Sequence, residues 1–207
     1  MRQKIIPSVM AKNQQELNQY FKKFKGIVKN LHLDIVDGKF APNKVMMFPF
    51  RLSKEFSYNA HLMMKNPLKF IEKNINKIDL LIPQFEEIKN PHKYIDWMKS
   101  KKKKVAFALN PETKVTQLIP YLKEIDYILV LTVHPGFYGS KFLPQQLKKV
   151  KQIKKINPKV KVIVDGGITT KNIHKVAEAD NFISGSFIKN AKFPKVAIKQ
   201  LLKESRI

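Results

Sequence analysis

Residues 127–133 read Tyr-Ile-Leu-Val-Leu-Thr-Val, an almost uninterrupted apolar run of strand length. Strands of a parallel sheet that is covered on both faces have this continuous pattern, because neither face meets water. Similar short apolar runs recur along the chain, at residues 5–6, 31–36, 58–63, 78–82, 105–109, 160–164 and 182–184. The sequence therefore predicts eight buried strands in a parallel sheet.

Amphipathic stretches separate these runs and predict helices. Residues 13–25 carry apolar side chains at three- and four-residue spacing behind Asn13, a residue type that caps helices. Further helices are expected from residue 67, over 91–98, 115–122, 143–156 and 170–177, and in a C-terminal stretch that ends near residue 202. This alternation of strand and helix favours an α/β fold, a closed TIM barrel, over an open doubly wound sheet. We expect a single domain over residues 1–207.

The composition excludes several classes of protein. No apolar run approaches the roughly 18 residues that a membrane span needs. The chain has no cysteine, which excludes disulfides and thiolate metal sites. The first ten residues contain Pro7 and lack a small-residue cleavage site, so we expect no signal peptide. A cytoplasmic protein without a membrane partner is expected.

The charge of the chain is strongly positive, with 40 Lys+Arg against 16 Asp+Glu and a formal net charge of +24. Such a balance invites a nucleic-acid interpretation. However, only Arg2, Arg51 and Arg206 are arginines, and the lysines are spread through every expected helix. Since bidentate recognition of bases and phosphates favours arginine, we expect no specific nucleic-acid partner. The positive field should instead concentrate anionic substrates, although a polyanion-binding barrel without catalysis is an alternative.

Ionisable side chains gather where the expected strands end. His32 and Asp34 are two residues apart, so they share one face of their strand, and in a barrel that face is the lumen. His61 ends the neighbouring strand, and Asp165 ends a strand across the barrel. Active sites of TIM barrels lie at this edge. Four such groups would be costly to bury without a cation, and they suit a divalent ion such as Zn²⁺, Fe²⁺, Mn²⁺ or Co²⁺.

Glycine-bearing turns follow three of the expected strands. They contain Gly136 with Gly139, Gly166 with Gly167, and Gly185 with Ser186. Glycine lets the backbone approach a ligand and expose its N–H groups, and TIM barrels commonly hold a phosphate at this place. The turns therefore predict a phosphate-binding site.

These motifs, in this order and spacing, resemble the ribulose-phosphate 3-epimerase family over nearly the whole chain. The strongest segment, residues 32–43, reads His-Leu-Asp-Ile-Val-Asp-Gly-Lys-Phe-Ala-Pro-Asn. It is followed by His-Leu-Met at 61–63, Ala-Leu-Asn-Pro at 108–111, Val-His-Pro-Gly-Phe at 133–137 and Val-Asp-Gly-Gly-Ile at 164–168. The resemblance implies an isomerase of the pentose phosphate pathway that converts D-ribulose 5-phosphate to D-xylulose 5-phosphate.

The resemblance also implies roles for individual residues. One divalent metal ion would be bound by His32, Asp34, His61 and Asp165. Asp34 and Asp165 would remove and return the C3 proton on opposite faces, through an enediolate. The sugar phosphate would contact Ser8, His61, Met63, Gly136, Phe137, Tyr138, Gly139, Gly166, Gly167, Gly185 and Ser186. Self-association into a homo-oligomer is compatible with this family.

The chain departs from the family pattern at three places near the expected site. Val36 stands where the family usually has methionine, and Tyr138 where its phosphate loop usually has glycine. Residues 82–86 read Ile-Pro-Gln-Phe-Glu where a His-x-Glu pattern is usual. These departures keep open a 3-epimerase for a related ketose phosphate, such as D-allulose 6-phosphate. A decarboxylase on the same barrel is disfavoured, since no lysine stands at these strand ends.

Overall fold

The computed structural model describes residues 4–176 and 178–205. Three residues named above lie outside the described residues, namely Arg2, Ala177 and Arg206. Ala177 is the last residue of the helix expected over 170–177. Within the described part of the chain, no helix is both long enough and apolar enough to cross a membrane.

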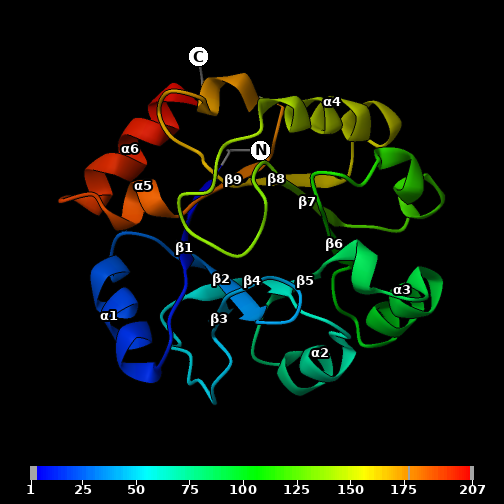
Figure 1. The fold of residues 1–207 in the computed structure, drawn as a ribbon, viewed down its shortest axis with the longest axis horizontal. Coiled ribbons are helices and arrows are strands. Elements are labelled where there is room, and N and C mark those ends of the chain that lie inside the picture. The colour runs from blue at the N-terminus through cyan, green and yellow to red at the C-terminus, as the bar shows by residue number, and fades with distance from the viewer. Residues whose placement is uncertain (1–3, 177, 206–207) are drawn as a thin grey trace.

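Eight parallel strands form a nearly closed barrel with the helices outside it (Figure 1), which confirms the expected α/β TIM-barrel fold. The strands are β1 Lys4–Val9, β2 Asn30–Asp37, β4 Ser57–Met63, β5 Leu80–Pro83, β6 Ala106–Leu109, β7 Tyr127–Leu131, β8 Lys161–Asp165 and β9 Asn181–Ser184. They are ordered β5-β4-β2-β1-β9-β8-β7-β6. A parallel bridge between Gln84 and Ala108 joins the two ends of this order, at β5 and β6.

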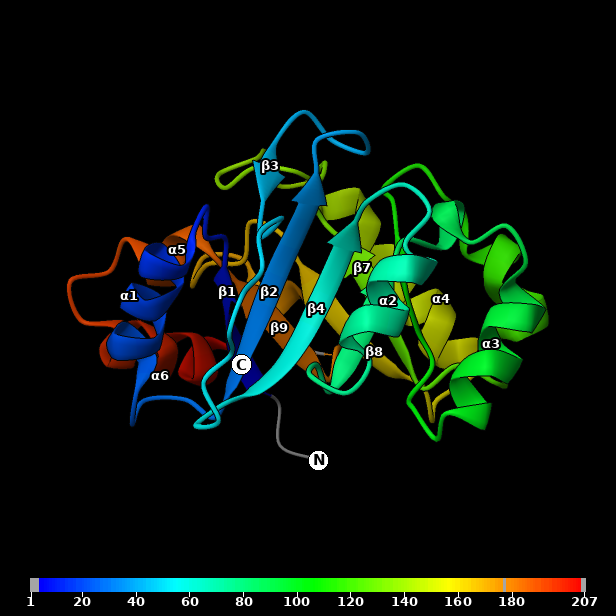
Figure 2. The ribbon, with the colours of Figure 1, turned by 90° about the horizontal axis from the view of Figure 1, so that it is seen from below.

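The strand register aligns the chemically active residues. Ser8 of β1 pairs with His32 of β2, and Asp34 pairs with His61 of β4. Asp165 ends β8, where it pairs with Leu131 of β7. The parallel strands point upward in Figure 2, so their carboxyl ends lie at the top of that view. Parallel strands therefore bring all of these side chains to one edge of the barrel.

Helices surround the barrel, and some of them begin at residues suited to that position. They are α1 Gln14–Phe24, α2 Leu68–Asn74, α3 Pro91–Ser100, α4 Leu147–Ile156, α5 Ser186–Lys189 and α6 Pro194–Glu204. The Asn13 side chain accepts a hydrogen bond of 2.9 Å from the Glu16 backbone N–H, which confirms the expected cap of α1. Pro91 opens α3, where its missing N–H costs no helical hydrogen bond.

Several expected helices differ in type or are divided. The stretch expected over 115–122 is a 3₁₀ helix, Val115–Tyr121, because Pro120 inside it has no N–H to continue an α-helix. The stretch over 143–156 divides into a 3₁₀ turn, Pro144–Gln146, and α4. A 3₁₀ turn, Ile173–Val176, replaces the α-helix expected there. The C-terminal stretch divides into α5 and α6 and runs past residue 202 to Glu204.

Two short elements near the barrel mouth were not predicted from the sequence. β3 Lys44–Val45 pairs antiparallel with the end of β2, so that Val45 lies opposite Val36. A 3₁₀ turn, Phe85–Glu87, follows β5. Beside β3, Val36 is fully buried in a cluster with Val45 and Met63. Val36 therefore stabilises the hairpin that borders the mouth.

Besides the Val36 cluster, the buried apolar residues of the described chain form two layers, one on each side of the strands. The larger layer lies between the barrel and its helices and contains fully buried Leu33, Phe107 and Phe182. The smaller layer fills the barrel interior and consists of Ile6, Leu80, Ile82, Ala106, Ala108, Leu129, Leu131, Ile163 and Ile183. Both faces of the strands are thus buried, which explains their uninterrupted apolar sequence. The filled interior leaves the carboxyl edge as the place for a site.

We predict that Leu129→Ala, at a fully buried position of the interior layer, lowers the free energy of unfolding by about 2–5 kcal/mol. The substitution leaves a cavity that neighbouring strands cannot close. Urea unfolding would measure the loss. Val196→Ala, at a position 50% exposed, is the control and should change stability by less than about 0.5 kcal/mol. Equal effects of the two substitutions would contradict the filled interior.

Candidate active site

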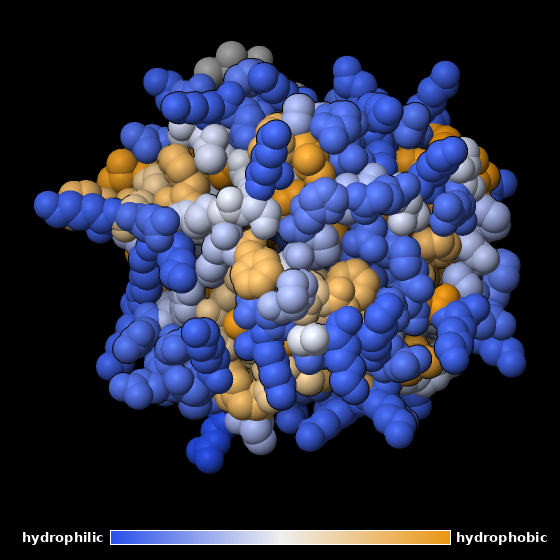
Figure 3. All heavy atoms as spheres, in the orientation of Figure 1, coloured by the Kyte–Doolittle hydropathy of each residue, from blue (hydrophilic) through white to orange (hydrophobic). Residues whose placement is uncertain are grey.

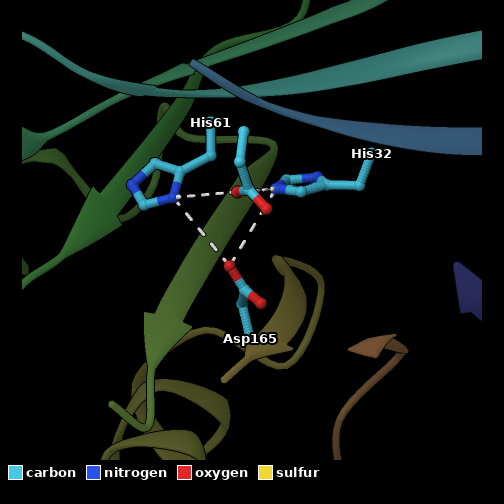
Figure 4. Close-up of side chains that lie close together, drawn as sticks. His32, His61 and Asp165 are labelled. Atoms are coloured by element: carbon cyan, nitrogen blue, oxygen red, sulfur yellow. Dashed lines mark ion pairs between the residues drawn. The ribbon is translucent and has the colours of Figure 1, made fainter. Parts of the chain in front are cut away.

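Two imidazoles and two carboxylates meet at the carboxyl edge of the barrel. His32 and Asp34 extend from β2, His61 from β4 and Asp165 from the end of β8. Each offers a ligand atom, and these atoms all lie within 4.8 Å of one another. Figure 4 shows the two rings and the Asp165 carboxylate directed toward each other. The predicted convergence of these residues in the lumen is therefore present in the structure.

The distances among these atoms fit a small cation. Asp34 Oδ1 lies 3.3 Å from His32 Nε2 and 3.9 Å from His61 Nδ1. Asp165 Oδ2 lies 3.9 Å from each of the same two nitrogens. Ligand atoms bonded to one tetrahedral Zn²⁺ at about 2.0–2.1 Å would lie about 3.3–3.4 Å apart. Small side-chain movements would thus complete such a site.

The outward nitrogens of both histidines are held by amide oxygens. His32 Nδ1 donates to Asn59 Oδ1 at 2.6 Å, and His61 Nε2 donates to Gln84 Oε1 at 3.2 Å. Gln84 is oriented in turn by donating from Nε2 to Asn110 Oδ1 at 2.6 Å. Because an amide oxygen only accepts, the ring hydrogens sit on these outward nitrogens.

In the neutral rings, the inward nitrogens are consequently bare lone pairs. His32 Nε2 and His61 Nδ1 are buried and have no hydrogen-bond partner among the described residues. Buried polar atoms are rarely left unpaired unless a ligand satisfies them. Metal-binding histidines have this same arrangement, with the second ring nitrogen donating to an oxygen acceptor. The residues present therefore fit a divalent metal ion.

The two carboxyl groups differ in their affinity for a proton. Burial, together with the nearby Asp34 charge, raises the pKa of Asp165 to about 7. Burial also acts to raise the pKa of Asp34, but His32, His61 and the donating Ser8 hydroxyl outweigh it and hold that pKa below its usual value. Near neutral pH, Asp34 is ionised while Asp165 can carry a proton. Unequal carboxyl groups of this kind are typical of acid/base pairs.

The two histidines also differ in pKa. Burial lowers the pKa of His61 to about 4, so its ring is neutral at physiological pH. Burial acts in the same direction on His32, but the neighbouring Asp34 and Asp165 outweigh it and raise the His32 pKa. A cation between the carboxylates would compete directly with a proton on His32.

A pocket opens above the four groups. It is lined by Asp34, His61 and Asp165, and by every predicted substrate-binding residue: Ser8, Met63, Gly136, Phe137, Tyr138, Gly139, Gly166, Gly167, Gly185 and Ser186. His32 lies beneath it, fully buried. The loop that carries residues 134–141 extends over the mouth of the barrel (Figure 1). The structure thus brings all the predicted residues to one place.

Gly166 shows why the turn after β8 needs glycine. Its φ of +113° lies in a region that other residues rarely adopt, and a Cβ there would lie 2.5 Å from Val133 Cγ2. This turn packs its backbone directly against Val133, which precedes the 134–141 loop. The backbone rather than a side chain therefore borders the pocket at this point.

Some residues around the site were missed by sequence reasoning, and His134, which directly follows the apolar run 127–133, does not join it. Asn59 and Gln84 hold the two histidines, yet the sequence assigned neither of them a role, although Gln84 lies in the segment 82–86 that departs from the family pattern. The signal for Asn59 was its position two residues before His61, on the same strand face. His134, by contrast, has a 66% exposed side chain and lies 3.4 Å from Glu112 at the surface.

The surface around the mouth is largely hydrophilic, with a small apolar group near its centre (Figure 3). Among the described residues that line the pocket, none is a lysine. Lys99, Lys104 and Lys154 lie away from the pocket and form ion pairs with carboxylates, while the buried Lys149 donates to the backbone oxygens of Asn110 and Pro111.

Comparison with solved structures matches the fold at low sequence identity. 3-Keto-L-gulonate-6-phosphate decarboxylase from Vibrio cholerae O1 superimposes with a TM-score of 0.71 at 8% identity, covering 100% of this chain and 98% of that one. KGPDC from Streptococcus mutans gives a TM-score of 0.67 at 13% identity, with coverage of 100% and 98%. These similarities support the barrel fold alone.

Comparison of sequences is more specific. The model of the ribulose-phosphate 3 epimerase family matches residues 4–189. Ribulose-phosphate 3-epimerase of Helicobacter pylori (strain J99) is 32% identical, over 96% of this chain and 96% of that protein. The enzyme of the same name from Aquifex aeolicus is 30% identical, over 91% and 90%. The chain therefore belongs to the ribulose-phosphate 3-epimerase family and is an epimerase.

Proposed function

We propose that this epimerase interconverts D-ribulose 5-phosphate and D-xylulose 5-phosphate, with Asp34 and Asp165 as its two proton carriers. The observation that carries the proposal is the meeting of these carboxylates from β2 and β8, on opposite sides of the barrel, with different pKa values. Inversion at a carbon needs one group on each face of it. Two unequal carboxylates meet that need.

The chemistry follows from the acidity of the C3 proton. That proton lies next to the ketone and is a weak acid, so its removal generates an enediolate. Asp34, ionised beside Ser8, accepts the proton on one face, while protonated Asp165 returns one on the other. In the reverse direction the two groups exchange roles. A divalent cation held by His32, Asp34, His61 and Asp165 would supply the positive charge that stabilises the enediolate.

The phosphate is assigned to the glycine turns after β8 and β9. Gly166, Gly167, Gly185 and Ser186 line the same pocket as the two aspartates. In the turn of α5, the backbone N–H of Lys189 donates to Gly185 O at 2.8 Å. The N–H groups that precede it in this turn are those that a helix leaves for a ligand. The formal net charge of +24 favours the approach of an anion. The convergence of acid/base groups favours catalysis over the alternative of a barrel that only binds polyanions.

The remaining expectations concern the protein as a whole. A single domain over 1–207, self-association into a homo-oligomer and a cytoplasmic location stay predictions of the sequence. Two imidazoles and two carboxylates suit each of Zn²⁺, Fe²⁺, Mn²⁺ and Co²⁺.

The first test replaces each carboxylate with its amide. We predict that Asp34→Asn and Asp165→Asn each lower kcat for D-ribulose 5-phosphate by about 10²–10⁴-fold, since each removes one of the two proton carriers. In D₂O, a variant with one remaining carboxylate should exchange the C3 proton of only one epimer. Metal content is measured alongside. Turnover by Asp34→Asn at the rate of the parent would show that the assignment is wrong.

A second prediction concerns the metal-free protein. The Asp165 pKa of about 7 lies above the value of about 3.9 for an unfolded aspartate. Its contribution to stability is therefore fully present below about pH 4 and is lost as the pH rises through 7. Asp165→Asn removes this loss. Relative to the parent, the variant should gain more than about 1.4 kcal/mol between pH 4 and pH 8, the equivalent of one pKa unit.

Urea unfolding in the presence of a chelator, at both pH values, would measure this gain. If the free energies of unfolding of Asp165→Asn and the parent differ by the same amount at pH 4 and at pH 8, the pKa of Asp165 in the folded protein lies near its ordinary value and the prediction is wrong.

A third prediction concerns the support of His61. Gln84→Leu removes the acceptor of the His61 Nε2 hydrogen bond, and we expect metal affinity to fall by about 10–100-fold. Competition between the protein and a chromophoric chelator for Co²⁺ would measure it. The exposed Gln145 provides the matched control, since Gln145→Leu touches no part of this network. Unchanged affinity in Gln84→Leu would exclude a supporting role.

A further inference from the structure

Tyr138 lies in the wall between two hollows of the molecule. One hollow is the pocket above Asp34 and Asp165. The other lies beside it and is lined by polar and cationic side chains, including Lys12, Lys23 and Lys189. Only Met10, Phe137 and Tyr138 are common to both linings as described. These three side chains therefore form the partition between the hollows.

Tyr138 is the member of this partition that is held from several sides. Its hydroxyl donates to the Ser8 carbonyl oxygen at 3.1 Å and lies 3.2 Å from Ser8 Oγ. Burial raises its pKa, so the hydroxyl keeps its proton and remains a donor. Lys189 Nζ lies 4.6 Å from the centre of the ring, at cation–π distance. Phe137, in contrast, is 52% exposed.

The ring of Tyr138 also takes up space at the proposed phosphate turn. A Cβ added to Gly185 would lie 2.5 Å from the Tyr138 ring and 3.5 Å from the Ser8 Cβ. The ring thus rests directly on the Gly185 backbone, between that turn and Ser8. Ser8 is in turn hydrogen-bonded to Asp34, so the ring lines the same pocket beside the residues that join the turn to that carboxylate.

We propose that Tyr138 is a specificity-determining residue that limits the substrate to a five-carbon ketose phosphate. The ring closes the pocket along its length and shuts off the neighbouring hollow, so a six-carbon ketose phosphate, with one more CHOH group between phosphate and ketone, meets the ring. This proposal rests on the proposed epimerase function. It reverses the expectation from sequence, in which Tyr138 was a reason to consider a hexulose phosphate.

The ring and the hydroxyl of Tyr138 have separable effects. The ring occupies volume, whereas the hydroxyl acts on Ser8. Tyr138→Phe keeps the ring and removes the contacts with Ser8, so it should alter kcat for both substrates without changing the preference between them. Tyr138→Ala removes the ring and joins the two hollows, so it should change the preference itself.

The test is the ratio of kcat/KM for D-allulose 6-phosphate to kcat/KM for D-ribulose 5-phosphate, both measured on the same preparation. We expect a preference for the pentulose in the parent, a rise of the ratio by at least about tenfold in Tyr138→Ala, or about 1.4 kcal/mol, and less than a threefold change in Tyr138→Phe. A ratio that stays within threefold in Tyr138→Ala, or that rises equally in Tyr138→Phe, overturns the proposal. A parent that prefers the hexulose also overturns it.

Two further measurements keep the outcome decisive. If Tyr138→Ala is not recovered as a folded protein, the ratio in Tyr138→Leu, which removes part of the ring volume, takes its place with the same limits. If the parent converts neither ketose phosphate, the proposed function fails. Calorimetry then tests the role of the Tyr138 ring separately, through the dissociation constants of D-allulose 6-phosphate and D-ribulose 5-phosphate in the parent and in Tyr138→Ala. The ratio of the two constants should shift by at least about tenfold in favour of the hexulose in Tyr138→Ala, and a shift of less than threefold overturns the proposal.

Discussion

The structure depends on bringing four ionisable side chains together in a buried place. Burying a charge or an unpaired polar atom is costly, so His32, Asp34, His61 and Asp165 can share one lumen only if they compensate each other. The carboxylates face the inward nitrogens of both histidines at 3.3–3.9 Å. These nitrogens nevertheless lack hydrogen-bond partners among the described residues. A divalent cation would resolve this imbalance, and the barrel holds the groups ready for one.

The surrounding residues set how each of the four groups can act. Asn59 and Gln84 hold the hydrogens of the two imidazoles on their outward nitrogens. Ser8 donates to Asp34 and is itself contacted by Tyr138. Asp34 therefore remains ionised, while burial keeps Asp165 able to hold a proton. The proposed proton transfer and the proposed choice of substrate thus involve neighbouring residues of one pocket.

Much of this could be predicted from the sequence, because its strands are buried on both faces and their apolar runs are unbroken. The two-residue spacing of His32 and Asp34 likewise placed both on one strand face. β3 could not be predicted, since two residues carry no periodic pattern. The role of Gln84 depends on contacts across β4, β5 and the end of β6, which spacing does not reveal. The position of the Tyr138 side chain depends on the packing of its ring against Gly185, and a sequence pattern does not reveal such a contact either.

In the proposed site, one cation is shared by the two imidazoles and the two proton-carrying carboxylates. A crystal structure of the Co²⁺- or Zn²⁺-loaded protein, with the ion located by anomalous scattering, tests it most directly. If the cation is shared in this way, we expect one ion at about 2.0–2.2 Å from His32 Nε2, His61 Nδ1 and an oxygen of each of Asp34 and Asp165. An ion bound elsewhere, or bound without the two inward nitrogens, would contradict it.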